Sequence, residues 1–249
     1  MLLAVDIGNT RIKVAVFEGT TLLEQFHFDC FELRNQLRFI LNKYKNASNL
    51  IVASVGNIQK EAFLEFEKQV NITFISPEFP FPFKNKYSTP TTLGIDRMVL
   101  ASGAVLKYPS QNRLVIDAGT CITYDFIDEN DNYLGGAISP GIRLRFESLN
   151  NYTAKLPLIT LESINEDQNI SFIGNSTIES INSGVINGII NEIEGFISQY
   201  QVNYPKFIII LTGGDAEFLA KRLKNTIFAN SNFLLESLNQ TFQQKIKND

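Results

Sequence analysis

The sequence predicts an α/β fold made of two duplicated halves, each a mixed β-sheet with helices around it. One pattern occurs twice: an apolar strand, an aspartate, a glycine, a hydroxyl residue and a returning strand, at 2–17 and at 114–127. The length of 249 residues suits two half-size domains around a shared cleft, with one large α/β unit as the alternative. We therefore predict an N-terminal half over 1–112 and a C-terminal half over 113–249.

The first half is predicted to begin with an antiparallel hairpin and to continue with alternating helices and strands. Loosely alternating or continuous apolar runs predict strands, and apolar stripes at helical spacing predict helices. The expected strands are 2–5, 11–17, 22–28, 50–55 and 72–75, and the expected helices are 31–44, 60–69 and 94–108. This order predicts a mostly parallel sheet with an antiparallel hairpin at its edge.

The second half repeats the hairpin and then adds a long helix and a buried strand. The expected strands are 114–116, 121–127, 133–141, 207–211 and a last short one at 233–235. Helices are expected from 141, over 177–200, which is the longest, and after a Thr-Gly-Gly-Asp turn at 212–215. That turn leads into a helix N-terminus, where backbone donors suit a phosphate or a ribose.

Composition indicates a chain that folds throughout and has no general affinity for polyanions. Hydrophobic residues make up 44% of the chain, with 20 Phe, and the 19% of charged residues argue against disorder. The net charge of −4 leaves no overall basic field of the kind that nucleic acid or an anionic membrane requires. We expect neither as a partner, so any phosphate must be bound by local groups.

The termini and the cysteines predict a reduced cytoplasmic protein. The N-terminus enters a strand directly, without a secretory leader, and the longest apolar run, 207–211, is too short to span a bilayer. Cys30 and Cys121 lie on separate elements without metal-ligand spacing, so neither a disulfide nor a zinc site is indicated. His27, the only histidine, lies between two Phe residues, which favours a packing or edge role.

The two aspartate-glycine turns are candidate phosphate sites. Glycine lets the backbone approach a ligand, and successive N–H groups in such a turn form a concave anion site. The carboxylates of Asp6 and Asp117 could hold a cation against phosphate oxygens. A single turn of this kind is also common as plain structure, but two tips that face each other would form a cleft for a nucleoside triphosphate and its metal.

A third aspartate, Asp96, opens a helix after a proline-rich aromatic loop at 77–87. A first-turn acid is favoured by the helix macrodipole, which is a purely structural explanation. A loop of this length inside a compact chain is often functional, and an Asp96-Arg97 pair at a helix start also suits a substrate site. Both explanations remain open at this point.

These motifs together resemble the type III pantothenate kinases, which belong to the acetate and sugar kinase, heat-shock chaperone and actin superfamily. The matching segments, in family order, are 6–10 with Lys13, Tyr87 with 94–97, 117–120, 135–141, 153–157, Thr177 with 183–184, and 212–216. The resemblance implies two ribonuclease H-like (actin-like ATPase) halves with the nucleotide in the cleft between them. Cys121 stands where a small residue is usual, and 159–173 carries no family signature.

The implied reaction is transfer of the ATP γ-phosphoryl group to the primary hydroxyl of pantothenate, the first step toward coenzyme A. Asp96 would be the catalytic base, Asp6 would hold Mg²⁺ through water, and Asp117 would bind the monovalent cation, K⁺ or NH₄⁺. The implied nucleotide-binding residues are Asp6, Ile7, Gly8, Asn9, Thr10, Arg11, Ile12, Lys13 and Thr120. The implied pantothenate-binding residues are Tyr87, Gly94, Ile95, Asp96, Arg97 and Thr177. The family also implies a homodimer, with the helix from Thr177 as its seam.

Two other functions remain as alternatives. Another small-molecule kinase of the superfamily would share both phosphate turns but should lack the Gly-x-Asp-Arg motif at 94–97. A nucleotide-binding transcriptional accessory protein would have no need of Asp96. Retention of Asp6, Asp96 and Asp117 together favours catalysis.

Overall fold

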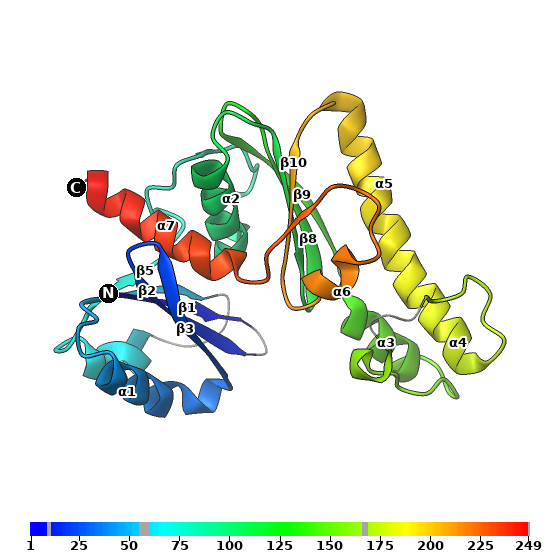
Figure 1. Cartoon of the computed structure of the whole chain (residues 1–249), viewed down its shortest axis with the longest axis horizontal. Helices are drawn as coiled ribbons and strands as arrows, with labels where there is room; N and C mark the ends of the chain where they lie inside the picture. Colours follow the sequence, from blue (N-terminus) through cyan, green and yellow to red (C-terminus); the bar gives the residue numbers. More distant parts are fainter. Residues whose placement is uncertain (9–10, 55–59, 166–168, 249) are drawn as a thin grey trace. The chain divides into compact units, whose positions relative to one another are not determined.

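The computed structural model describes residues 1–8, 11–54, 60–165 and 169–248 (Figure 1). The chain divides into two compact units, and each has its own apolar core. Unit 1 consists of Met1–Ser110, Asn130–Leu134 and Asn232–Asp249, and unit 2 consists of Gln111–Glu129 and Gly135–Ser231. The chain therefore leaves unit 1 and returns to it twice.

The sheet of unit 1 has the strand order β3-β2-β1-β4-β5. Its strands are β1 (Leu2–Ile7), β2 (Ile12–Glu18), β3 (Thr21–Phe28), β4 (Asn49–Ser54) and β5 (Asn71–Phe74). β2 is antiparallel to both β1 and β3, whereas β4 is parallel to both β1 and β5. The predicted parallel region with an antiparallel hairpin edge is confirmed.

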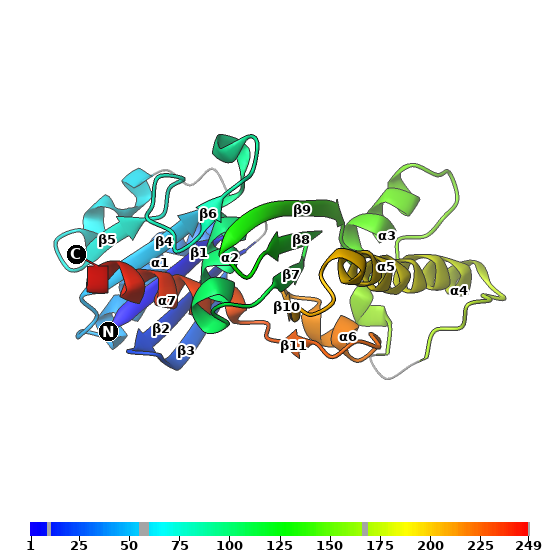
Figure 2. The same ribbon diagram turned by 90° about the horizontal axis from the view of Figure 1, so that it is seen from above.

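Alternate side chains of β1 enter different cores, because successive residues of a strand point to opposite faces. Leu3 packs in the cluster that contains α1 (Leu33–Lys43). Leu2 packs in the cluster that contains α2 (Ile95–Lys107) and α7 (Phe233–Asn248). The sheet of unit 1 is thus covered by helices on both faces (Figure 2).

Two expected elements differ from the structure. The strand predicted at 233–235 is wrong, because these residues begin helix α7, whose buried Leu235, Leu238 and Phe242 recur at helical spacing. The short apolar run at 233–235 suits a strand only when the residues that follow it are left out of consideration. The helix expected over 60–69 is a 3₁₀ segment, η2 (Lys60–Phe66).

The second sheet has the order β11-β10-β7-β8-β9-β6. Its strands are β6 (Lys84–Asn85), β7 (Arg113–Ala118), β8 (Cys121–Ile127), β9 (Asn132–Pro140), β10 (Ile208–Thr212) and β11 (Phe228–Ala229). β7 is antiparallel to β8 and parallel to β10, the same relations that β1 has with β2 and β4. The sequence pattern that occurs twice therefore forms the same strand pairing in both sheets.

A long helix packs its apolar stripe on the sheet of unit 2. It runs as α4 (Thr177–Asn182), a π-helical turn η5 (Ser183–Asn187) and α5 (Gly188–Asn203), which confirms the helix predicted from 177. The unit also contains α3 (Ile142–Asn151), α6 (Ala216–Ala220) and the 3₁₀ turn η4 (Leu161–Ser163), while unit 1 has η1 (Cys30–Glu32) and η3 (Pro90–Thr92). Among the described residues, no helix combines the length and apolarity that crossing a membrane demands.

Candidate functional site

The second hairpin tip, residues 117–121, joins β7 to β8 and is held by backbone contacts. The Gly119 N–H donates to the Cys121 carbonyl at 3.0 Å, and the Gly141 N–H donates to the Thr120 carbonyl at 3.0 Å. A Cβ on Gly141 would lie 2.1 Å from the Gly119 carbonyl oxygen, so only glycine permits this approach. The residue that follows β9 therefore supports the tip.

The turn after β10 lies against the same tip. Parallel pairing places Thr212 beside Asp117, and the Asp215 N–H donates to the Ala118 carbonyl at 3.0 Å. Gly213 has a φ of +94°, and a Cβ there would lie 2.5 Å from Asp117 Oδ1. Because the left-handed backbone region favours glycine, the Thr-Gly-Gly sequence is what lets the turn approach this carboxylate.

Two polar groups of this turn are buried in a way that suits a ligand. The Thr212 side chain is 1% exposed, and its hydroxyl has no hydrogen-bond partner among the described residues. Burial raises the pKa of Asp215 to about 6, a shift that Arg143 opposes and Glu162 reinforces. Buried polar groups in proteins are normally satisfied, so an orphaned hydroxyl beside Asp117 leaves room for a cation or for ligand oxygens.

The first hairpin tip, residues 6–13, joins β1 to β2. Asp6 is 7% exposed and lies opposite Lys13 in the backbone register of the β1–β2 hairpin. The Gly8 N–H donates to the Arg11 carbonyl at 3.2 Å. Asn9 and Thr10, two of the expected phosphate ligands, lie outside the described residues. The described part of the tip thus combines one carboxylate with two cationic residues.

The electrostatic environment of this tip is positive. His27 of the edge strand β3 pairs with Lys13, and its pKa is lowered first by burial and then by the charges of Lys13 and Arg11. The edge position agrees with the role expected for this histidine. An acidic chain thus carries a local cationic patch where phosphate binding was expected.

The substrate motif, residues 94–97, caps and opens helix α2. The Asp96 Oδ1 accepts a hydrogen bond from the Arg97 N–H at 2.8 Å, and a Cβ on Gly94 would lie 2.4 Å from that oxygen. The Arg97 guanidinium lies 5.8 Å from the centre of the Tyr87 ring. The structure therefore brings Tyr87, Gly94, Asp96 and Arg97 together in unit 1.

An aromatic column fixes the loop that carries Tyr87. Ring centroids follow one another at 5.4 Å from Phe79 to Phe81, 5.3 Å from Phe81 to Phe83 and 5.8 Å from Phe83 to Tyr133. Tyr133 is fully buried and lies 6.2 Å from Tyr87. The proline-rich loop is therefore an ordered support for the Tyr87–Arg97 contact.

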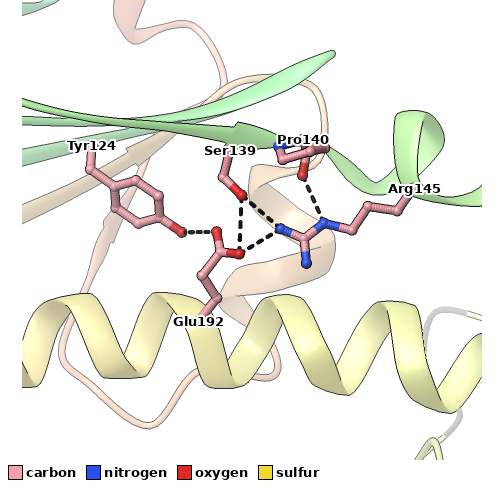
Figure 3. Close-up of polar contacts among 5 residues, drawn as sticks. All are labelled: Tyr124, Ser139, Pro140, Arg145 and Glu192. Atoms are coloured by element: carbon pink, nitrogen blue, oxygen red, sulfur yellow. Dashed lines mark hydrogen bonds and ion pairs between the residues drawn. The ribbon is translucent and has the colours of Figure 1, made fainter. Parts of the chain in front are cut away.

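Sequence reasoning missed a partly buried polar group that we call the Glu192 cluster, formed by Tyr124, Ser139, Pro140, Arg145 and Glu192 (Figure 3). The Glu192 carboxylate accepts hydrogen bonds from the Tyr124 hydroxyl at 2.9 Å, the Ser139 hydroxyl at 3.0 Å and Arg145 Nη2 at 2.6 Å. The available signal was an acid on the apolar stripe of the long helix, three residues after the buried Ile189.

These bonds shift the ionisation of both acids in the cluster. Burial raises the pKa of Glu192, but the hydrogen bonds from Arg145, Tyr124 and Ser139 outweigh it and leave this pKa below its ordinary value. Burial, followed by the Glu192 contact, raises the pKa of Tyr124. Glu192 is therefore an anion and Tyr124 a neutral donor at neutral pH.

Thr177, another predicted pantothenate-binding residue, belongs to unit 2, whereas the motif at 94–97 belongs to unit 1. It begins α4 next to the capping residue Ser176 and lines a cavity of about 940 Å³. Arg145 of the Glu192 cluster lines the same cavity.

Comparison with known proteins identifies related sequences. A family model described as type III pantothenate kinase matches residues 2–199. The type III pantothenate kinase of Flavobacterium johnsoniae is 67% identical over 249 residues, which is 100% of each chain.

Solved structures extend the comparison to the fold. A Campylobacter jejuni protein assigned to the Baf family of transcriptional activators aligns with a TM-score of 0.65 and 22% identity, covering 98% of this chain and 99% of that one. A glucokinase from an Antarctic psychrotroph aligns with a TM-score of 0.54 and 13% identity, covering 98% of each chain. At these identities the likeness concerns the fold alone, and it confirms the two-unit sugar-kinase type of α/β fold predicted from the duplicated hairpins.

Proposed function

The chain belongs to the type III pantothenate kinase family, and on that premise we propose that it transfers the γ-phosphoryl group of ATP to the primary hydroxyl of pantothenate. The product is 4′-phosphopantothenate, and the reaction is the first step of coenzyme A biosynthesis. The observation that carries the proposal is the full-length 67% identity, joined to the Tyr87–Arg97–Asp96 arrangement in unit 1.

Asp96 is the catalytic base, and Arg97 holds the acceptor or the transferring phosphoryl group. Phosphoryl transfer passes through a loose transition state, so positioning and charge neutralisation dominate, and a carboxylate of ordinary basicity suffices. The Arg97 N–H fixes one Asp96 oxygen at 2.8 Å, which leaves the other for the pantothenate hydroxyl. Tyr87, Gly94, Ile95 and Thr177 complete the pantothenate pocket.

The two hairpin tips bind the triphosphate of ATP. In the first tip, Ile7 to Lys13 supply backbone donors and the cationic side chains of Arg11 and Lys13, which the local positive environment supports. In the second tip, Thr120 adds a hydroxyl, and the buried Thr212 hydroxyl offers a further unsatisfied donor.

Asp6 binds Mg²⁺ through water, and Asp117 binds K⁺ or NH₄⁺. Clusters of three or more His, Cys, Asp or Glu side chains that could hold a metal are absent from the described residues. Mg²⁺ commonly keeps several waters and takes one or two carboxylates plus phosphate oxygens, so a single carboxylate at each tip fits these cations. Bound there, the cations would neutralise the charge that develops on the phosphates.

The enzyme acts as a homodimer in the cytoplasm and has no nucleic-acid or membrane partner. The exposed apolar side chains of Phe172, Ile173 and Ile178, at and before the start of α4, support a seam along this helix. The net charge of −4 supports the absence of a polyanion partner.

A coupled assay of ADP release tests the proposal. ADP release should require both pantothenate and K⁺ or NH₄⁺, and mass spectrometry should detect 4′-phosphopantothenate. ADP release that pantothenate does not change, but that a sugar or acetate stimulates, would indicate another kinase of the superfamily. ATP binding without any turnover would favour a regulatory protein instead.

A further inference from the structure

The Glu192 carboxylate joins three elements that meet at the second hairpin tip. Its donors come from β8 (Tyr124), from the end of β9 (Ser139) and from α3 (Arg145), while Glu192 itself lies on α5. Hydrogen bonds to a charged group are about twice as strong as neutral ones, so one side chain fixes the relative positions of all three elements.

Arg145 links Glu192 to the Pro140–Gly141 segment, which supports the second hairpin tip. Its Nε donates to the Pro140 carbonyl at 2.8 Å, and its backbone N–H donates to the Gly141 carbonyl at 3.1 Å. Gly141 in turn donates to the Thr120 carbonyl at 3.0 Å. Figure 3 shows the part of this series that joins Glu192, Arg145 and Pro140, and the backbone bonds of Gly141 continue it to Thr120.

We propose that Glu192 is a positioning residue for the nucleotide, which holds Arg145 so that the Pro140–Gly141 segment keeps the Gly119–Thr120 tip in its phosphate-binding conformation. This rests on the proposed function only in that Thr120 is assigned to ATP. Glu192 acts through Arg145, so its effect should appear in the affinity for ATP.

The first test is Glu192→Ala, with kinetics for both substrates and calorimetric titration with MgADP. The KM for ATP and the Kd for MgADP should each rise about tenfold, the effect of losing one charged hydrogen bond from a positioning series. The kcat at saturating substrates should stay within about twofold, because the motif at 94–97 that carries Asp96 belongs to unit 1.

Glu192→Gln is the conservative variant that should preserve ATP binding. Its amide oxygen can accept from Arg145 and Ser139, and its amide nitrogen can donate to the Tyr124 oxygen, so the three contacts remain without the charge. ATP parameters close to those of the wild type are expected. The matched control is Glu194→Gln on the same helix, since Glu194 binds only Lys224 and Asn225 among the contacts described here.

Several results would overturn the proposal. An unchanged MgADP affinity in Glu192→Ala would do so, as would a kcat that falls as much as the KM for ATP rises, or an equal effect of Glu194→Gln. If Glu192→Ala does not fold, Arg145→Ala replaces it, because it removes the contacts with Glu192, Ser139 and the Pro140 carbonyl, and an unchanged MgADP affinity there counts against the proposal. MgADP titration decides the matter even if pantothenate is not the substrate, so failure of the proposed function is detected separately.

Discussion

The two hairpin tips share a sequence pattern but differ in how they are held. The second tip is supported by Gly141 and by the Gly213–Asp215 turn, both distant in sequence. The described part of the first tip is closed by the local Gly8–Arg11 hydrogen bond. The same strand-Asp-x-Gly sequence therefore specifies a hairpin locally, while the rigidity of its end depends on partners that arrive much later in the chain.

The tips also differ in charge. Lys13 lies opposite Asp6 in the hairpin, and the charges of Lys13 and Arg11 add to burial in lowering the pKa of His27. Beside Asp117 lie an orphaned Thr212 hydroxyl and the buried Asp215. We therefore expect the cationic side chains of the first tip to neutralise phosphate charge beside the Mg²⁺ at Asp6, and the second tip to hold the monovalent cation.

The largest expected effect on kcat comes from a substitution at Asp96, which lies outside both tips. Asp96→Asn should lower kcat by roughly 10²–10⁴-fold, because the acceptor hydroxyl loses its base. Steady-state kinetics measure this, and the thermal unfolding midpoint should stay near that of the wild type. Turnover close to the wild-type value would remove Asp96 from its role.

Substitutions of the two tip aspartates should change the dependence of activity on different cations. Asp117→Asn should abolish activation by K⁺, whereas Asp6→Asn should raise the Mg²⁺ concentration needed for half-maximal activity by roughly tenfold or more. Titration of each cation in both variants measures the difference. If both variants lose the same cation dependence, the proposed division between the tips is wrong.

Gly141→Ala tests the support of the second tip. A Cβ would meet the Gly119 and Thr120 carbonyl oxygens at 2.1 and 2.7 Å, so the tip must move, and the KM for ATP should rise about tenfold. Gly195→Ala in α5 is the control, because nothing lies within 4 Å of its added Cβ. This control should leave kinetics unchanged and stabilise the helix by about 0.5–1 kcal/mol.

The smallest effect concerns pH and Asp215. Its folded pKa of about 6 exceeds the ordinary 3.8, so the neutral form is favoured in the folded protein, and stability falls as pH rises from about 4 to about 6. Asp215→Asn should therefore raise the free energy of unfolding at pH 7 and leave it unchanged below pH 4. Denaturant unfolding at both pH values measures this, and equal effects at the two would contradict it.

Local sequence was sufficient for the two hairpins, the long helix and the mixed character of the first sheet, because the apolar runs at β1 and β7 are each followed by an Asp-x-Gly turn and a returning strand. The short strands β6 and β11 and the strand order of the second sheet were not predicted. Glu192 was not predictable as part of a network, because its donors lie 47 to 68 residues away and hydrogen bonds between such positions have no local signature. The segment at 233–235 was misassigned because a short apolar run suits either element until its continuation is considered.

Helix α7 belongs to unit 1 although it is translated after unit 2. This helix packs Leu235, Leu238 and Phe242 against the sheet and against α2, the helix that bears Asp96. During translation these side chains emerge after all of unit 2, so until then the face of the N-terminal sheet that they cover together with α2 lacks part of its cover. A nascent chain that stalls before residue 232 would expose that face and should be a substrate for chaperones or proteases.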